Sequence, residues 1–163
     1  MNKPIVLIVI GSENDLPIMK ETSSILTSFG ICYRLVLASA HRAPEKVAML
    51  SKEAEKEGIQ IIIAGAGMAA HLAGAFAAHT ILPVIGVPIN ASLSGFDALL
   101  STVQMPGGVP VATVSIGKAG AKNAGLLAAQ ILALNSTELR EKLHDYKETM
   151  AQQIEDKQLE LER

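Results

Sequence analysis

The sequence has few of the residues that dominate several familiar kinds of binding site. Its 163 residues include no tryptophan, two tyrosines and three phenylalanines, which leaves little aromatic surface to enclose a flavin ring. Cys32 is the only cysteine, so an internal disulfide is excluded and a reducing compartment, the cytoplasm, is expected. No apolar run reaches the roughly 18 residues of a membrane span, so we expect no membrane partner.

Charge and motif content exclude further classes of function. The formal net charge is -2, which provides no basic surface for nucleic acid. Neither the spacing of metal ligands nor the glycine motif of a dinucleotide site or P-loop is present. We therefore expect no metal ion, and a dinucleotide or P-loop nucleotide site is disfavoured. Hydrophobic residues, in contrast, make up 49% of the chain, which favours burial of surface between subunits.

Short β-branched runs alternate with helical patterns along the chain. Strands are predicted at 5–10, 31–38, 59–64, 84–87 and 109–116. Helices are predicted at 16–28, 44–57, after the third strand to about 79, at 97–103 and at 119–134. This alternation predicts an α/β fold, a three-layer α/β/α sandwich with a flavodoxin-like parallel five-stranded sheet.

A long C-terminal helix is predicted at about 136–160, after a core at 4–135, within one domain spanning 1–163. Its apolar residues recur at steps of three and four, while many of the others are charged. Two interpretations stay open: the helix reaches a neighbouring subunit, or it packs on its own domain. The apolar residues are Leu139, Leu143, Tyr146, Met150 and Ile154.

In such a sheet, ligands bind at the carboxyl ends of the strands. After the first strand, Gly11 permits a tight turn, while Ser12 and Asn14 offer polar side chains. Asp15 would stand at the start of the first helix, where free N–H groups attract anions such as phosphate. The alternative is that Asn14 or Asp15 only caps that helix.

The second strand is followed by Ser39, His41 and Arg42. Arginine binds phosphate or carboxylate through two parallel hydrogen bonds, and histidine can transfer a proton near neutral pH. A lone histidine is more often structural, but one beside arginine and serine at a ligand-binding edge favours function. We therefore expect these three residues to belong to a site.

A glycine- and alanine-rich segment follows the third strand. Its open backbone N–H groups suit an oxyanion or a flat ring, whereas its small side chains also suit close packing of a helix on the sheet. His71 could either line a site or satisfy a backbone group. The candidate residues here are Gly65, Gly67, Ala70 and His71.

Five segments together resemble the PurE family of purine biosynthesis. They are Gly-Ser-x-x-Asp (11–15), Ser-Ala-His-Arg-x-Pro (39–44), Ala-Gly-x-Gly-x-Ala-Ala-His-Leu (64–72), Val-Gln-Met-Pro-x-Gly-x-Pro-Val (103–111) and the run 116–124. They occur in the family's order and spacing across the predicted core. Arg42 resembles the class I branch, because class II members tend to have lysine there.

The resemblance implies an isomerase, an N5-carboxyaminoimidazole ribonucleotide mutase that works without metal or cofactor. Its product would be 4-carboxyaminoimidazole ribonucleotide, in de novo purine (IMP) biosynthesis. His41 would be the acid–base residue, and His71 would bound the pocket. Ser12, Asp15 and Arg42 would bind the ribose phosphate. The carboxyl group would be surrounded by Ser39 and the loop 65–70, which includes Gly65, Gly67 and Ala70.

The resemblance also implies homo-octamers in which neighbouring subunits complete each site, and functional coupling to the synthetase that makes the substrate. This sequence departs from the family at Asn14, usually Ser; at Met68, often Gly; at Ala73, often Pro; and in the loop 89–95, one residue shorter. Two alternatives remain. One is an aminoimidazole ribonucleotide carboxylase using free CO2, and the other is a non-catalytic nucleotide-binding module of flavodoxin-like fold.

Overall fold

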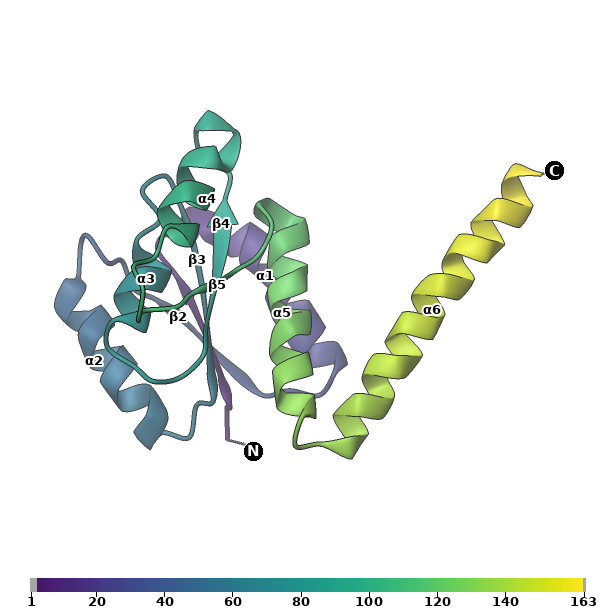
Figure 1. The fold of residues 1–163 in the computed structure, drawn as a ribbon, viewed down its shortest axis with the longest axis horizontal. Helices are drawn as coiled ribbons and strands as arrows, with labels where there is room; N and C mark the ends of the chain where they lie inside the picture. The colour runs from purple at the N-terminus through teal and green to yellow at the C-terminus, as the bar shows by residue number, and fades with distance from the viewer. Residues whose placement is uncertain (1–2, 163) are drawn as a thin grey trace. The chain divides into compact units, whose positions relative to one another are not determined.

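The β-branched runs form one parallel five-stranded sheet in the computed structural model, which describes residues 3–162 (Figure 1). The strand order is β2-β1-β3-β4-β5. β1 and β3 are central and almost wholly buried, as expected for apolar strands covered on both faces. The strands are β1 (Val6–Ile10), β2 (Tyr33–Leu37), β3 (Ile61–Gly67), β4 (Val84–Ile89) and β5 (Ala112–Thr113).

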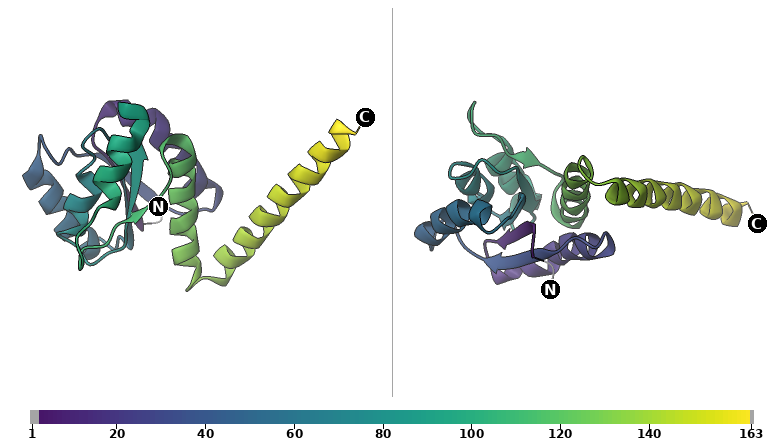
Figure 2. Two further views of the ribbon diagram at one scale, coloured as in Figure 1. Left: turned by 45° about the horizontal axis from the view of Figure 1, so that its top comes forward. Right: turned by 90° about the horizontal axis from the view of Figure 1, so that it is seen from below.

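Helices cover both faces of this sheet, which confirms the predicted three-layer sandwich (Figures 1 and 2). The first five helices are α1 (Leu16–Ser28), α2 (Pro44–Lys56), α3 (Leu72–Ala77), α4 (Phe96–Val103) and α5 (Gly117–Ala133), and a sixth, α6 (Thr137–Leu161), follows them in the chain. Two short 3-10 helices, η1 (Glu13–Asp15) and η2 (Leu93–Gly95), precede α1 and α4 and were not expected from the sequence.

Alternate strand residues bury against different helices. Leu7 and Val9 of β1 belong to a core cluster with α2 and α3 residues such as Val47 and Phe76. On the other side α1 and α5 are tied together, because the Thr22 hydroxyl donates to the Ala121 carbonyl at 2.7 Å. The sheet is therefore fixed from both faces, which gives its strand ends fixed positions.

The main departures from the predicted elements lie at β3, α3 and β5. β3 continues to Gly67 because it pairs with β4 up to Ile89, and α3 is short. β5 has only two residues, since Pro110 lacks an N–H and the segment pairs with β4 alone. No helix within residues 3–162 is both long and apolar enough to span a membrane.

The chain forms two compact units, the first ending at Ala128 and the second beginning at Ala129. In the second unit the Ser136 hydroxyl accepts a hydrogen bond from the Leu139 amide at 3.3 Å and caps the start of α6. None of the residues that the structure describes in α6 is buried, and Ile154 is 66% exposed. Of the five residues of the predicted apolar stripe, Leu139, Leu143 and Tyr146 are half-buried, and Met150 and Ile154 are exposed.

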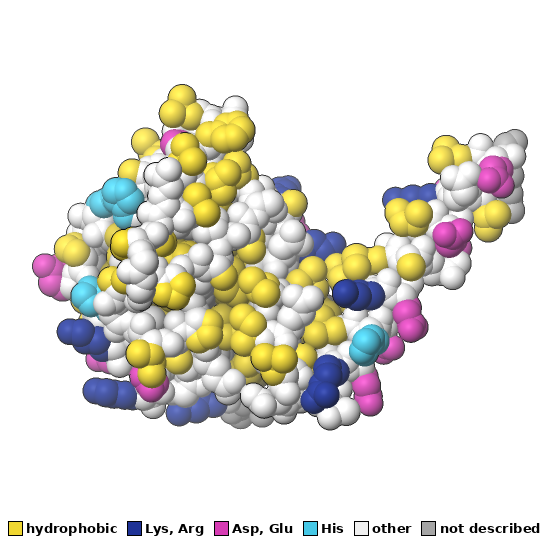
Figure 3. Space-filling model, in the orientation of Figure 1, with side chains coloured by type: hydrophobic (Ala, Val, Ile, Leu, Met, Phe, Trp, Pro, Cys, Tyr) yellow, Lys and Arg dark blue, Asp and Glu magenta, His cyan; other side chains and the backbone are white. Residues whose placement is uncertain are grey.

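Exposed apolar side chains also gather on η2 and α4 (Figure 3). Leu93 is 76% exposed and Phe96 61%, and Leu100 and Val103 are each 50% exposed. Phe96, Leu100 and Val103 recur at steps of four and three on one face of α4, and Leu93 lies in η2 just before that helix. We refer to these four residues as the α4 apolar face.

Gly120 provides a test of the packing at the start of α5. An added Cβ would collide with the backbone carbonyl of Ser115. Alanine usually stabilises a helix interior relative to glycine by about 0.8–1 kcal/mol. Here we expect the opposite sign, with Gly120→Ala lowering the free energy of unfolding by about 2–3 kcal/mol in urea titrations, because backbone cannot move aside cheaply.

Gly107→Ala is the matched control, since no heavy atom lies within 4 Å of its added Cβ. Its free energy of unfolding should stay within about 0.5 kcal/mol of the wild-type value. Equal effects of the two substitutions would contradict the close approach at Gly120.

Candidate active site

The carboxyl ends of β1, β2 and β3 meet because Ile10 pairs with Leu37 on one side and Gly65 on the other. Gly11 extends this contact, since its N–H donates to the Gly65 carbonyl at 3.2 Å. The Gly11 carbonyl in turn accepts from Nη2 of Arg42 at 2.8 Å. The first glycine after β1 thus connects the ends of three strands.

A cavity of about 460 Å³ opens at this edge. Most predicted site residues line it: Ser12, Asn14, Asp15, Ser39, His41, Arg42, Gly67 and His71. The structure therefore brings together residues from three separate segments, as the order of a parallel sheet requires. We call this space the histidine cavity.

A second space of about 460 Å³ adjoins the first. Both are lined by Gly11, Ser12, Asn14, Ser39 and Arg42. Glu13 and Lys46 line only the second, which we call the cation cavity. The two cavities form a continuous groove across the strand ends.

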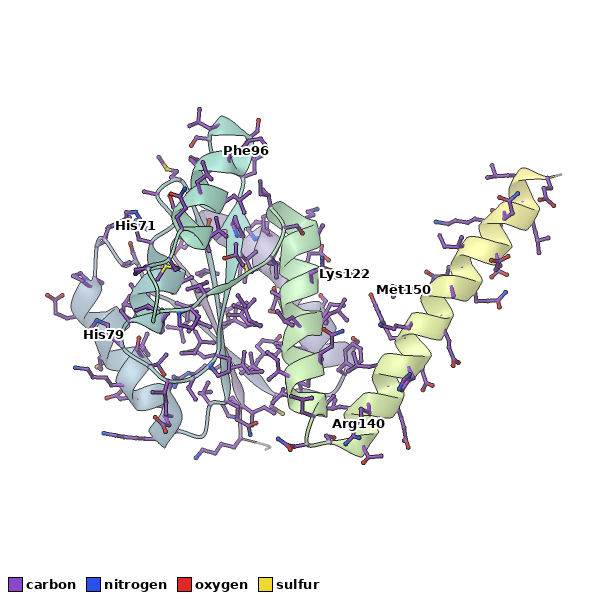
Figure 4. The ribbon with its side chains drawn as sticks, viewed as in Figure 1. His71, His79, Phe96, Lys122, Arg140 and Met150 are labelled. Carbon is purple, nitrogen blue, oxygen red and sulfur yellow. The ribbon has the colours of Figure 1, made fainter. Side chains whose placement is uncertain are left out.

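The two histidines of the site lie against each other. Nε2 of His41 is 2.8 Å from Nδ1 of His71, and the rings are nearly perpendicular, at 80°. This hydrogen bond requires one ring nitrogen to carry hydrogen and the other to accept, which restricts the tautomers of the pair. His71 precedes α3 and His79 follows it, at the opposite end of that helix (Figure 4).

Asp15 is held beneath the groove and is only 6% exposed. Its carboxylate accepts from the Ser12 amide at 2.9 Å, and the Ser12 hydroxyl accepts from the Asn14 amide at 3.3 Å. These bonds cap η1, not α1, so Asp15 both fixes the loop and lines the histidine cavity. Burial raises the pKa of Asp15, although the Ser12 and Gly11 amides and the Arg42 charge oppose the rise.

Two predicted site residues, Gly65 and Ala70, do not line either cavity. Gly65 is still within β3, and its added Cβ would lie 2.5 Å from Sδ of Met19. Ala70 is 2% exposed. Both positions are small because of packing, and Gly65 contributes its carbonyl to Gly11 instead of a surface to the ligand.

Gly67, two residues further along the chain, does line the histidine cavity. Its added Cβ would lie 2.9 Å from Cβ of Ala91, so the loop after β4 crosses directly over it. That crossing places Ala91 in the histidine cavity, a position that no sequence motif indicated. The same loop turns through Leu93, Ser94 and Gly95, all with positive φ.

Met68 also lines the histidine cavity and has φ of 56°, a left-handed conformation that favours glycine. The backbone thus accounts for the glycine that the family resemblance implies at this position. Its side chain is 62% exposed at the rim. Ala73 is buried in α3 and lies near Gly86, so its departure from proline leaves the groove unchanged.

The sequence analysis did not identify Lys46 as a site residue, although it follows Arg42 by four residues and borders the cation cavity. Residues four apart lie on the same side of a helix, so the spacing of Arg42 and Lys46 at the start of the predicted helix could have indicated it. Among residues 3–162, no group of three or more His, Cys, Asp or Glu side chains is arranged to hold a metal ion.

Comparisons with known proteins agree with the geometry. Residues 5–153 match the model of the AIR carboxylase family. The chain is 53% identical to the N5-carboxyaminoimidazole ribonucleotide mutase of Pyrococcus horikoshii, over 98% of this chain and 90% of that protein. It is 52% identical to the mutase of the same name from Bacillus subtilis, over 93% of this chain and 94% of that protein.

A solved structure has the same fold. The crystal structure of Treponema denticola PurE superimposes with a TM-score of 0.88 at 33% sequence identity. The match covers 98% of this chain and 99% of that one. The similarity therefore includes the strand ends that form the groove.

The buried carboxyl of Asp15 predicts a pH-dependent difference in stability. Its pKa is raised above 3.8 in the folded state, so the unfolded chain loses this proton first as pH rises. Wild-type stability should therefore fall relative to Asp15→Asn from about pH 3.8 upward, and the difference should level off above the folded-state pKa. Urea unfolding of both proteins between pH 3.5 and 7.5 measures it. A wild-type stability that stays constant or rises relative to that of Asp15→Asn as pH rises would contradict this assignment.

Proposed function

The chain belongs to the AIR carboxylase family, and we propose that it is the mutase that converts N5-carboxyaminoimidazole ribonucleotide to 4-carboxyaminoimidazole ribonucleotide in purine biosynthesis. The observation that carries this conclusion is the roughly 50% identity, over nearly whole chains, to proteins named for that activity. The groove adds support, because it has two histidines that could transfer a proton at one end and the cations Arg42 and Lys46 at the other.

The phosphate and ribose would bind through Arg42, Ser12 and Asp15. Arg42 offers a guanidinium whose Nη2 is anchored on Gly11, which leaves other N–H groups for an anion. The Asp15 carboxylate can accept hydrogen bonds from ribose hydroxyls at the groove floor. Asn14, where similar sequences have serine, can still donate through its amide.

His41 would move the one proton that the isomerisation requires. Breaking the bond between the exocyclic nitrogen and the carboxyl carbon releases CO2 and leaves a nitrogen that needs a proton. Attack of the ring carbon on CO2 forms the new C–C bond, after which that carbon loses a proton. Substrate and product are isomers, so one group that gives and takes back a proton is sufficient.

His71 would orient His41 and select its tautomer through the 2.8 Å contact between the rings. Ser39 and Gly67 line the same cavity and would bound the carboxyl group. CO2 offers few hydrogen-bonding handles, so confinement beside the ring carbon must supply much of the rate. Small residues in this wall leave room for a snug space.

The active form is proposed to be a homo-octamer in the cytoplasm. The exposed α4 apolar face and the exposed Met150 and Ile154 of α6 support association of copies, because isolated domains rarely leave so much apolar surface open. A phosphorylated substrate does not cross membranes unaided, which supports a cytoplasmic site of action. The unstable substrate supports functional coupling to the synthetase that supplies it.

Turnover of fresh N5-carboxyaminoimidazole ribonucleotide tests the assignment. We expect rapid formation of 4-carboxyaminoimidazole ribonucleotide with a chelator present and no added bicarbonate. Product formed only from aminoimidazole ribonucleotide and bicarbonate would assign the carboxylase reaction instead. Binding of the nucleotide without either reaction would assign a non-catalytic module.

His41→Asn tests the proton-transfer role. We expect kcat to fall about 10²- to 10⁴-fold, because asparagine keeps polarity but cannot exchange a proton near neutral pH. KM should change little, since the cationic end is intact. His79→Asn is the matched control, because His79 is exposed and borders neither cavity. Wild-type turnover by folded His41→Asn protein would refute the role.

A further inference from the structure

The cation cavity contains charged residues that the mechanism above does not use. Lys46 and Glu13 both border it, beside Arg42. Lys46 lies in the first turn of α2, four residues after Arg42, so the two cations reach the cavity from one helix start. The reaction itself takes place at the histidine end of the groove.

The ammonium of Lys46 has a defined position despite its exposure. Nζ donates to the carbonyl of Leu37 at 2.8 Å. Leu37 is the last residue of β2 and pairs with Ile10, so this contact ties the lysine to the sheet edge that carries the site. An ammonium has three donors, and one bond to Leu37 leaves two for a ligand.

The balance of charges explains why one cation is insufficient to bind a phosphate group here. Glu13 and Asp15 bring two carboxyl groups to the region that Arg42 occupies. A phosphate monoester adds about 1.5–2 negative charges at neutral pH. Arg42 alone would leave a large excess of negative charge, whereas Lys46 offsets the local carboxylates and makes the anion acceptable.

The residues shared by the two cavities lie between the charged end and the histidines. Ser12, Asn14 and Ser39 offer hydroxyl and amide groups there. A sugar bound across them would extend its phosphate toward Lys46 and its base toward His41. The groove therefore matches the polarity of a phosphorylated nucleoside from end to end.

We propose that Lys46 is the second cation for the substrate 5′-phosphate, and that it makes the enzyme select the nucleotide over uncharged sugars. This inference rests on the proposed function for the identity of the nucleotide. The phosphate contact itself can be tested with a simpler ligand.

Lys46→Met removes the charge and nearly preserves the size of the side chain. We expect KM for N5-carboxyaminoimidazole ribonucleotide to rise about five- to tenfold while kcat stays within about twofold, because the interaction is electrostatic and remote from the histidines. Lys46→Arg should restore most of the affinity. Lys52→Met, an exposed charge removal on the same helix outside both cavities, should match wild type.

Ribose 5-phosphate provides a binding test that requires no catalysis. Its Kd, measured by calorimetry, should rise about five- to tenfold in Lys46→Met, fall about twofold in Glu13→Gln, and stay unchanged in Lys52→Met. Higher salt concentration should reduce the difference in Kd between wild type and Lys46→Met. Unphosphorylated ribose should show no dependence on Lys46.

The inference is overturned if Lys46→Met and Lys52→Met bind ribose 5-phosphate equally, or if Lys46→Met lowers kcat and leaves KM and Kd unchanged. A wild-type protein that fails to turn over the nucleotide refutes the proposed function. In that case the ribose 5-phosphate series still decides whether Lys46 binds phosphate.

Discussion

The site depends on one short chain of hydrogen bonds through Gly11. Its N–H is bound to the carbonyl of Gly65 and its carbonyl to the guanidinium of Arg42. These two bonds connect the ends of β1, β2 and β3, so a change in the register of any of the three strands would move a different part of the groove. Positioning by a buried sheet is more exact than positioning by loops alone, because the strands are packed from both faces.

Asp15 shows what this arrangement requires of the fold. Its carboxylate is withdrawn from water under the first turn, which raises its pKa, and it is held there by amide donors of the same loop. The amide donors do not fully compensate for the loss of water around the Asp15 carboxylate, so its charged form is destabilised in the folded protein. A ribose hydroxyl that donates to this carboxylate would supply hydrogen bonding that the free protein lacks.

Much of the architecture could be predicted from sequence, because apolar runs mark the strands and glycine or proline residues mark where helices and strands end. α1 has the predicted bounds, since η1 precedes Leu16 and Gly30 takes a left-handed φ after its end. His41 and His71 both line the cavity at the strand ends, although the strand-end rule alone left the role of His71 open. Gly65 could not be assigned in this way, because its small size serves the packing of Met19 and becomes visible only once the register of β3 is known.

In the proposed mechanism, the exposure of the site residues would link catalysis to assembly. His41, Arg42 and His71 are all exposed on the isolated chain, yet a released CO2 molecule must be kept beside the ring carbon and away from water. The nucleotide can cover only part of the groove. The remaining cover has to be another surface, and the α4 apolar face shows that the chain has apolar surface available for contact with further copies. Association would then complete the reaction chamber as well as bury apolar area, and the proposed oligomer would be part of the mechanism and not only a source of stability.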